Sequence, residues 1–254
     1  MIRIAAVGLG AFRILLAAAM AVVGLPMAVV VLAISMGAPT LVSRYGQRGM
    51  RLWSGITRPL LGIRVRTIGT PPPPGSFAVC NHVSHFDVLI ITSLYPTSLI
   101  AKKEILRWPL LGQLAWMIGT VFVDRSDRDK TADVARTMGT YLQAGSTVTL
   151  FPEGTCGDGK AILPFKRSLF AVPVELAIPT WPVAVRYPDP AAAWDDDTPM
   201  ALHMFRLLRR WRQEAVIVFG DPIPPGMERK PLAFHAQAEV ERLFAQAGDT
   251  SGGA

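Results

Sequence analysis

The chain has 254 residues, of which 50% are hydrophobic and 18% charged, and its formal net charge is +7. This composition excludes a disordered or fibrous chain and fits one α/β domain, alone or with an appendage. A basic and apolar chain has two main classes of partner, anionic membranes and nucleic acids. The two cysteines, Cys80 and Cys156, cannot form a disulfide framework and make no CxxC pair, so nothing indicates a structural zinc site.

The first predicted element is an apolar membrane segment at residues 14–43, which contain no charged side chain. As one straight helix this run would be about 45 Å long, against about 30 Å of hydrocarbon. Pro26 and Pro39 interrupt it, so we expect either one tilted membrane-spanning helix or a two-helix hairpin. Arginines flank both ends, which gives no clear orientation but fits the hairpin slightly better. A cleaved signal peptide and a buried helix of a soluble protein are the weaker alternatives.

After residue 62, short apolar runs alternate with helix-like stretches, and this alternation predicts an α/β sheet covered by helices. We expect a single open mixed sheet. Strands are predicted at residues 77–80, 98–101, 120–123, 147–151, 181–186 and 215–219. Helices are predicted at residues 87–94, 109–118, 130–143, 165–177 and 232–247. The expected organisation is a membrane anchor at residues 1–60, one domain at residues 61–247 and a frayed tail at residues 248–254.

The most specific motif is NHVSHFD at residues 81–87, directly after a predicted strand. On a regular helix His82 and Asp87 would point about 140° apart, so they meet only if His82 lies in the loop and Asp87 in the first helical turn. The carboxylate would then accept from the imidazole Nδ1–H and leave Nε2 as a base for a hydroxyl. Alternatively, Ser84 and Asp87 form a capping box that only starts the helix.

Two further segments place charged side chains at strand ends. Glu153 lies in FPEGT at residues 151–155, in a glycine-rich turn of the kind that binds ligands in open α/β sheets. Arg125 ends the segment at residues 119–125, and its guanidinium suits a phosphate. The alternatives are an ordinary turn for Glu153 and a surface salt bridge for Arg125.

These three segments, together with residues 178–183, resemble the four ordered blocks of the glycerolipid acyltransferase family, most closely the bacterial 1-acylglycerol-3-phosphate acyltransferases. The resemblance covers residues 63–225. It implies a membrane-bound enzyme of phospholipid biosynthesis that moves an acyl group from acyl-CoA or acyl carrier protein to the free hydroxyl of lysophosphatidic acid, giving phosphatidic acid. It also implies that His82 is the general base and that Asp87 orients it.

The same resemblance implies which residues bind substrate. Arg125, Glu153 and Gly154 would hold the glycerol phosphate region, and residues 178–182 would help to form a substrate pocket. The family usually places an arginine after the threonine of its third block, but Cys156 follows Thr155 here. The predicted substrate-binding set is therefore Arg125, Glu153, Gly154, Thr155, Lys102 and Pro182.

The missing arginine leaves two acceptors open. Lys102, Lys103 and Lys166 could supply the missing cation for lysophosphatidic acid, which we expect as the acceptor. Related bacterial enzymes that acylate lyso-ornithine lipid look similar and often lack that arginine, so O-acylation of lyso-ornithine lipid is the leading alternative.

Other classes of function have less support. A metal hydrolase could use His82, His85, Asp87 and Glu153, but a third clear ligand is lacking. No GxSxG motif indicates a serine hydrolase. A non-catalytic membrane scaffold stays open, whereas no nucleic-acid motif accompanies the basic residues. The expected mechanism needs no metal or prosthetic group.

Residues 203–212 carry four arginines and no acid, which predicts an interfacial helix on anionic lipid. The expected partners are membrane lipids, the lysophospholipid acceptor and the acyl donor. We therefore expect the enzyme at the inner (cytoplasmic) membrane, with its active site facing the cytoplasm.

Overall fold

The computed structural model describes residues 2–36, 38–108, 112, 115–116, 119–123, 128–194 and 198–249. Its centre is a seven-stranded sheet with the order β1-β7-β6-β2-β5-β3-β4. The strands are β1 (Ile63–Ile68), β2 (Phe77–Cys80), β3 (Ser98–Lys102), β4 (Val121–Val123), β5 (Val148–Leu150), β6 (Thr180–Arg186) and β7 (Gln213–Phe219). All neighbours pair in parallel except β6 and β7, which are antiparallel. The predicted single open mixed sheet is confirmed.

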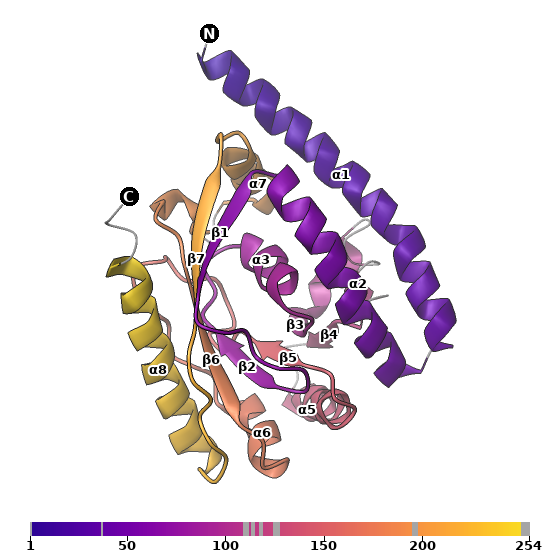
Figure 1. Cartoon of the computed structure of the whole chain (residues 1–254), viewed down its shortest axis with the longest axis vertical. Coiled ribbons are helices and arrows are strands. Elements are labelled where there is room, and N and C mark those ends of the chain that lie inside the picture. Colours follow the sequence, from indigo (N-terminus) through magenta and orange to yellow (C-terminus); the bar gives the residue numbers. More distant parts are fainter. Residues whose placement is uncertain are drawn as a thin grey trace.

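Helices cover both faces of the sheet (Figure 1). The helices after residue 60 are α3 (Phe86–Leu94), α5 (Arg128–Gln143), α6 (Ala171–Glu175), α7 (Met200–Leu208) and α8 (Arg229–Asp249). Val79 and Ala184 face the core under α5, α6 and α8, whereas Ala78 and Val183 face the core under α3 and α7. This alternation is what a strand buried on both faces requires.

Two predicted helices differ from the observed structure. The helix expected at residues 165–177 is instead a 3-10 turn, Ser168–Phe170, followed by the short α6. Pro173 lies in the first turn of α6, the one part of a helix where a missing N–H costs little. The helix expected at residues 203–212 ends at Leu208, and β7 begins at Gln213. Strand β1 was not predicted from the sequence, and the helix expected at residues 109–118 lies mostly outside the described residues.

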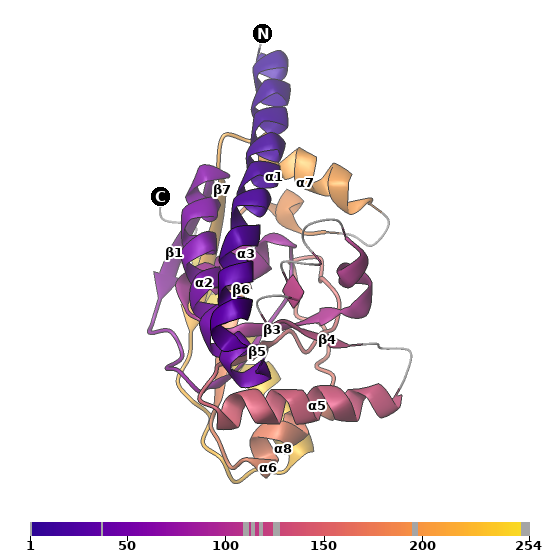
Figure 2. The same cartoon turned by 90° about the vertical axis from the view of Figure 1, so that its right-hand side faces the viewer.

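The N-terminal segment is a two-helix hairpin of α1 (Ile2–Ser35) and α2 (Pro39–Leu60), which lie side by side (Figures 1 and 2). The chain turns between the two helices and not at Pro26, which lies inside α1. Pro39 occupies the first turn of α2, where its fixed φ favours a helix start. Among the described residues, Ala5–Ser35 is the one helix long and apolar enough to cross a membrane.

The polar side of α2 is hydrogen-bonded to the sheet domain. Gln47 Nε2 donates to the carbonyl of Thr147 at 2.9 Å and to Ser98 Oγ at 3.0 Å. The hydroxyls of Ser54 and Thr92, on α2 and α3, lie 2.8 Å apart. Although α2 ends at the expected boundary near residue 60, it packs as a part of the sheet domain.

The helix α1 lies over α2 and reaches α7. The buried guanidinium of Arg13 donates to the carbonyls of Leu208, Arg210 and Trp211. The outward side of α1 exposes large apolar side chains, namely Val7, Phe12, Ile14, Leu15, Val22, Val23, Val29, Val30 and Ile34. One side of α1 is therefore fixed to the domain, and the other is an exposed apolar stripe.

Candidate active site

The candidate site begins where β2 ends. The side chain of the buried Asn81 continues the pairing of β2 with β6, since its Nδ2 donates to the carbonyl of Val185 at 2.9 Å and its Oδ1 accepts from Val185 N–H at 2.8 Å. This double hydrogen bond fixes where the chain leaves the sheet. Residues 82–85 form a loop at the carboxyl edge of β2, the usual place for a ligand site in an open α/β sheet.

His82 lies in this loop and Asp87 in the first turn of α3. The imidazole Nδ1 is 2.8 Å from Asp87 Oδ2. A carboxylate only accepts hydrogen bonds, so Nδ1 carries the hydrogen and Nε2 keeps its lone pair. Asp87 is fully buried, whereas the His82 side chain remains 16% exposed. The two side chains therefore meet in the geometry that the motif predicted.

Asp87 also binds the loop before α3, which is one half of the expected capping box, whereas the N-cap of α3 is His85, without a side-chain cap hydrogen bond. Oδ2 of Asp87 accepts from the backbone N–H groups of Val83 at 2.7 Å and Ser84 at 2.9 Å. Its Oδ1 accepts from the hydroxyl of Tyr187 at 2.5 Å. With both oxygens occupied, the carboxylate has a fixed orientation toward His82.

Tyr187 is a residue of the site that was not predicted from the sequence. It is buried directly after β6, the strand that pairs with β2. Burial and the neighbouring Asp87 raise the pKa of its phenol well above the usual value. The one signal in the sequence was its place after a predicted strand, and the strand order was needed to bring it to Asp87.

The turn after β5 holds His82 from three sides. Glu153 Oε1 accepts from the His82 N–H at 2.6 Å, and Gly157 N–H donates to the His82 carbonyl at 2.7 Å. The ring of Phe151 stacks on the imidazole with centroids 4.4 Å apart. The backbone and the ring of His82 are therefore both fixed by this glycine-rich turn.

Glu153 itself is 4% exposed, and its Oε2 accepts from Leu163 N–H at 2.9 Å. Burial raises its pKa to about 7. Both oxygens thus contact the main chain of the protein. A direct contact between Glu153 and a substrate stays a prediction.

The other predicted binding residues lie at different depths. Gly154 has φ of 77°, and the Lys166 side chain occupies the space that a Cβ there would need, so this position favours glycine. Thr155 follows in the same turn and is partly exposed. Lys102 is exposed at the end of β3, whereas Pro182 is buried within β6, opposite Val79. Arg125 lies outside the described residues.

His85, the second histidine of the motif, has a different environment. Its ring lies 4.4 Å from that of Trp194 and 6.3 Å from that of Trp108, measured between centroids. Its Nε2 is buried without a hydrogen-bond partner among the described residues. Burial lowers its pKa to about 4, so this ring is neutral near pH 7.

A metal centre has no ligand set in the part of the chain that the structure describes. No group of three or more His, Cys, Asp and Glu side chains there could hold an ion. The chemistry that the described site supports is proton transfer at His82 Nε2.

Comparisons with known proteins identify the family and the fold. Residues 63–186 match the family model described as Acyltransferase. The chain is 34% identical over 211 residues to the lyso-ornithine lipid O-acyltransferase of Pseudomonas aeruginosa, covering 80% of this chain and 81% of that one. It is 36% identical over 129 residues to the 1-acyl-sn-glycerol-3-phosphate acyltransferase of Neisseria gonorrhoeae, covering 51% of each. The crystal structure of the 1-acyl-sn-glycerophosphate acyltransferase of Thermotoga maritima has the same fold, with a TM-score of 0.70 over 97% of both chains at 19% identity.

Proposed function

Because the chain belongs to the acyltransferase family of the lysophosphatidic acid and lyso-ornithine lipid type, we propose that His82 and Asp87 catalyse transfer of an acyl group to a free lysolipid hydroxyl. The observation that carries this proposal is the imidazole itself. Its Nδ1 is held by a buried carboxylate, and its ring remains partly exposed at the carboxyl edge of the sheet.

The proposed reaction is direct transfer. The acyl donor is a thioester, acyl-CoA or acyl carrier protein. His82 Nε2 takes the proton of the acceptor hydroxyl while the hydroxyl oxygen attacks the thioester carbonyl. Asp87 stabilises the imidazolium that forms. The tetrahedral intermediate then expels the thiolate, which takes the proton from His82, so that an ester and a thiol leave the enzyme.

This mechanism uses no metal and no prosthetic group. The acceptor supplies the nucleophile, His82 moves the proton, and the thiolate is the leaving group. Glu153 and Gly157 keep His82 in place through its main-chain N–H and carbonyl. We propose that the same glycine-rich turn, with Gly154, Thr155, Lys102 and Arg125, contacts the acceptor headgroup.

We propose lyso-ornithine lipid as the acceptor. Relatives with that name match about four fifths of this chain, and Cys156 stands where an arginine suited to a phosphate monoester would be expected. This order reverses the expectation from sequence. Lysophosphatidic acid remains the second candidate, because relatives acting on it by name match half of the chain and Lys166 packs against Gly154.

The test is an acyl transfer assay of the purified protein with lyso-ornithine lipid and lysophosphatidic acid side by side, using acyl-CoA and acyl carrier protein as donors. We expect kcat/KM at least tenfold higher with lyso-ornithine lipid. Preference for lysophosphatidic acid would refute the proposed acceptor, and no transfer to either would refute the function.

The variant Cys156→Arg sharpens this assay. An added guanidinium gains a charge-assisted hydrogen bond only if the acceptor presents a nearby phosphate. We therefore expect the variant to shift preference toward lysophosphatidic acid and to impair transfer to lyso-ornithine lipid. Cys156→Ser is the matched control, because it keeps the size of the side chain without the charge.

We also propose that the hairpin holds the enzyme on the cytoplasmic side of the inner membrane. Two observations support this: the exposed apolar stripe of α1, and the packing of α1 along α2 and against α7. A helix of 34 residues is about 51 Å long, well beyond the hydrocarbon thickness of about 30 Å. Because α1 packs along α2, which itself packs on the sheet domain, we propose that α1 lies within one leaflet and does not cross the bilayer.

A further inference from the structure

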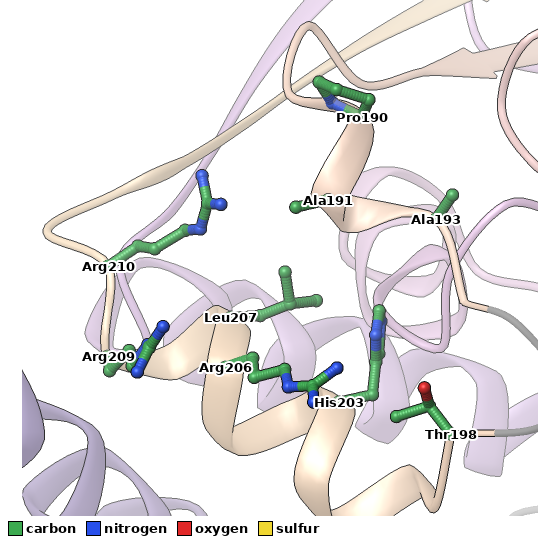
Figure 3. Close-up of a pocket in the computed structure, with 9 residues that line it drawn as sticks. All are labelled: Pro190, Ala191, Ala193, Thr198, His203, Arg206, Leu207, Arg209 and Arg210. Atoms are coloured by element: carbon green, nitrogen blue, oxygen red, sulfur yellow. The ribbon is translucent and has the colours of Figure 1, made fainter.

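A cavity lies beside α7 (Figure 3). It has a volume of about 310 Å³. Its wall is apolar at Ala191, Ala193 and Leu207. Three arginines line it as well, Arg206 on α7 and Arg209 and Arg210 directly after that helix. The cavity therefore combines a small apolar wall with concentrated positive charge.

Among the residues that the structure describes, one of these three guanidiniums has an ion-pair partner. Arg210 forms an ion pair with Asp189. None of the residues that the structure describes forms an ion pair with Arg206 or Arg209. Each of these two guanidiniums can bind a phosphate through paired N–H donors.

The cavity also adjoins the apolar helix α1. Gly10 lies against α7 so closely that a Cβ there would come within 2.9 Å of Arg209 and Phe205. Beyond the arginines, the indole of Trp211 is 82% exposed. Exposed tryptophan and arginine beside an apolar helix are typical of a lipid–water interface. A lipid whose phosphate occupied this cavity would thus have its headgroup at the membrane surface and its acyl chains beside α1.

The residues that line the cavity do not include His82 or Asp87. Trp194 connects the catalytic loop with the cavity wall: its N–H donates to the Val83 carbonyl, its ring packs on His85, and its Nε1 donates to the carbonyl of Thr198. A volume of about 310 Å³ is at the small end of ligand cavities, which suits a headgroup better than the nucleotide of an acyl donor.

We propose that this cavity binds the phosphate of a membrane phospholipid headgroup and so holds the enzyme on the bilayer beside its catalytic loop. The proposal rests on the membrane location proposed above. It concerns a lipid that is neither donor nor acceptor in the reaction. Arg206 and Arg209 supply the charge, and the apolar wall receives the glycerol carbons.

The test is calorimetric titration of the full chain, in a neutral detergent, with dihexanoylphosphatidylglycerol below its micelle concentration and separately with inorganic phosphate. We expect saturable binding of the lipid. Arg206→Gln and Arg209→Gln should each weaken it at least tenfold, a loss of about 1.4 kcal/mol. Both side chains are exposed, so the variants should fold. Arg212→Gln is the matched control, because Arg212 pairs with Glu214 and does not line the cavity.

Three results would overturn the proposal. Equal weakening by Arg212→Gln would indicate a general charge effect, and inorganic phosphate binding as tightly as the lipid would indicate a site for the free anion. If Arg206→Gln or Arg209→Gln raised the KM for the acceptor and left lipid binding unchanged, the cavity would be assigned to the acceptor. Since the titration involves no transfer, His82→Ala protein should bind the lipid normally. A wild-type protein that binds lipid but transfers no acyl group would refute the proposed function and leave the cavity assignment intact.

Discussion

The hydroxyl of Tyr187 donates to Asp87 Oδ1 at 2.5 Å, across 100 residues of sequence. The other oxygen of Asp87 accepts from His82 Nδ1 and from two backbone N–H groups. Tyr187 is therefore the side-chain donor that fixes the carboxylate from the side away from the imidazole. This makes it a positioning residue, acting on His82 through Asp87.

Tyr187→Phe tests that role. The variant keeps the ring but removes a hydrogen bond to a charged group, which contributes about 1.5–3 kcal/mol. We expect kcat to fall roughly tenfold and the acceptor KM to stay unchanged, because Tyr187 contacts Asp87 and not the substrate in this account. Steady-state kinetics separate the two parameters. A raised KM at constant kcat would assign Tyr187 to binding instead.

His85→Phe tests the difference between the two histidines of the motif. The pKa of His85 is lowered to about 4, mainly by burial, whereas an unfolded histidine titrates near 6.5. The unfolded chain therefore takes up a proton first as the pH falls, and the stability present above pH 6.5 is lost between about 6.5 and 4. Phenylalanine retains the packing on Trp194 without this proton.

The measurement is Tm at pH 7.5 and at pH 4.5 for both proteins. We expect the Tm of His85→Phe to fall less on acidification than that of the wild type. An equal fall in both proteins would show that His85 does not titrate as described.

Deletion of residues 2–36 tests the membrane role of α1. It leaves α2 whole, including the buried contacts of Gln47 and Ser54. We expect most of the shortened protein to leave the membrane fraction and the remainder to wash off at high salt, since only exposed basic residues such as Arg206 and Arg209 would then attract anionic lipid. Complete retention at high salt, measured by flotation, would contradict the anchor.

The contacts within the candidate site show which parts of its geometry could be predicted from the sequence. The contact between His82 and Asp87 could be predicted from local rules. The two residues are only five positions apart, and the strand end, the loop and the first helical turn fix the backbone between them. The partner of Asp87 could not be found this way, because Tyr187 reaches it only through the order of β6 beside β2. The same holds for Glu153, whose contacts with the main chain of His82 and Leu163 depend on packing between two turns.

Proline has different effects at three positions. Pro26 and Pro39 both interrupt the apolar run, but the chain turns just before Pro39, which starts α2, while α1 continues through Pro26. At residues 165–177 the sequence predicts one helix that contains Pro173, whereas in the structure α6 begins only at Ala171. Pro39 and Pro173 lie in first helical turns, where a missing N–H costs little, whereas Pro26 lies inside α1.

The most direct test of the account compares His82→Ala with His85→Phe in the acyl transfer assay. Removal of a general base costs typically 10²–10⁴ in rate, so we expect kcat/KM of His82→Ala to fall by about that factor while its Tm and membrane binding remain near those of the wild type. His85→Phe should stay within a few-fold of the wild-type rate. If His82→Ala kept more than half of the wild-type activity, His82 would not be the catalytic base.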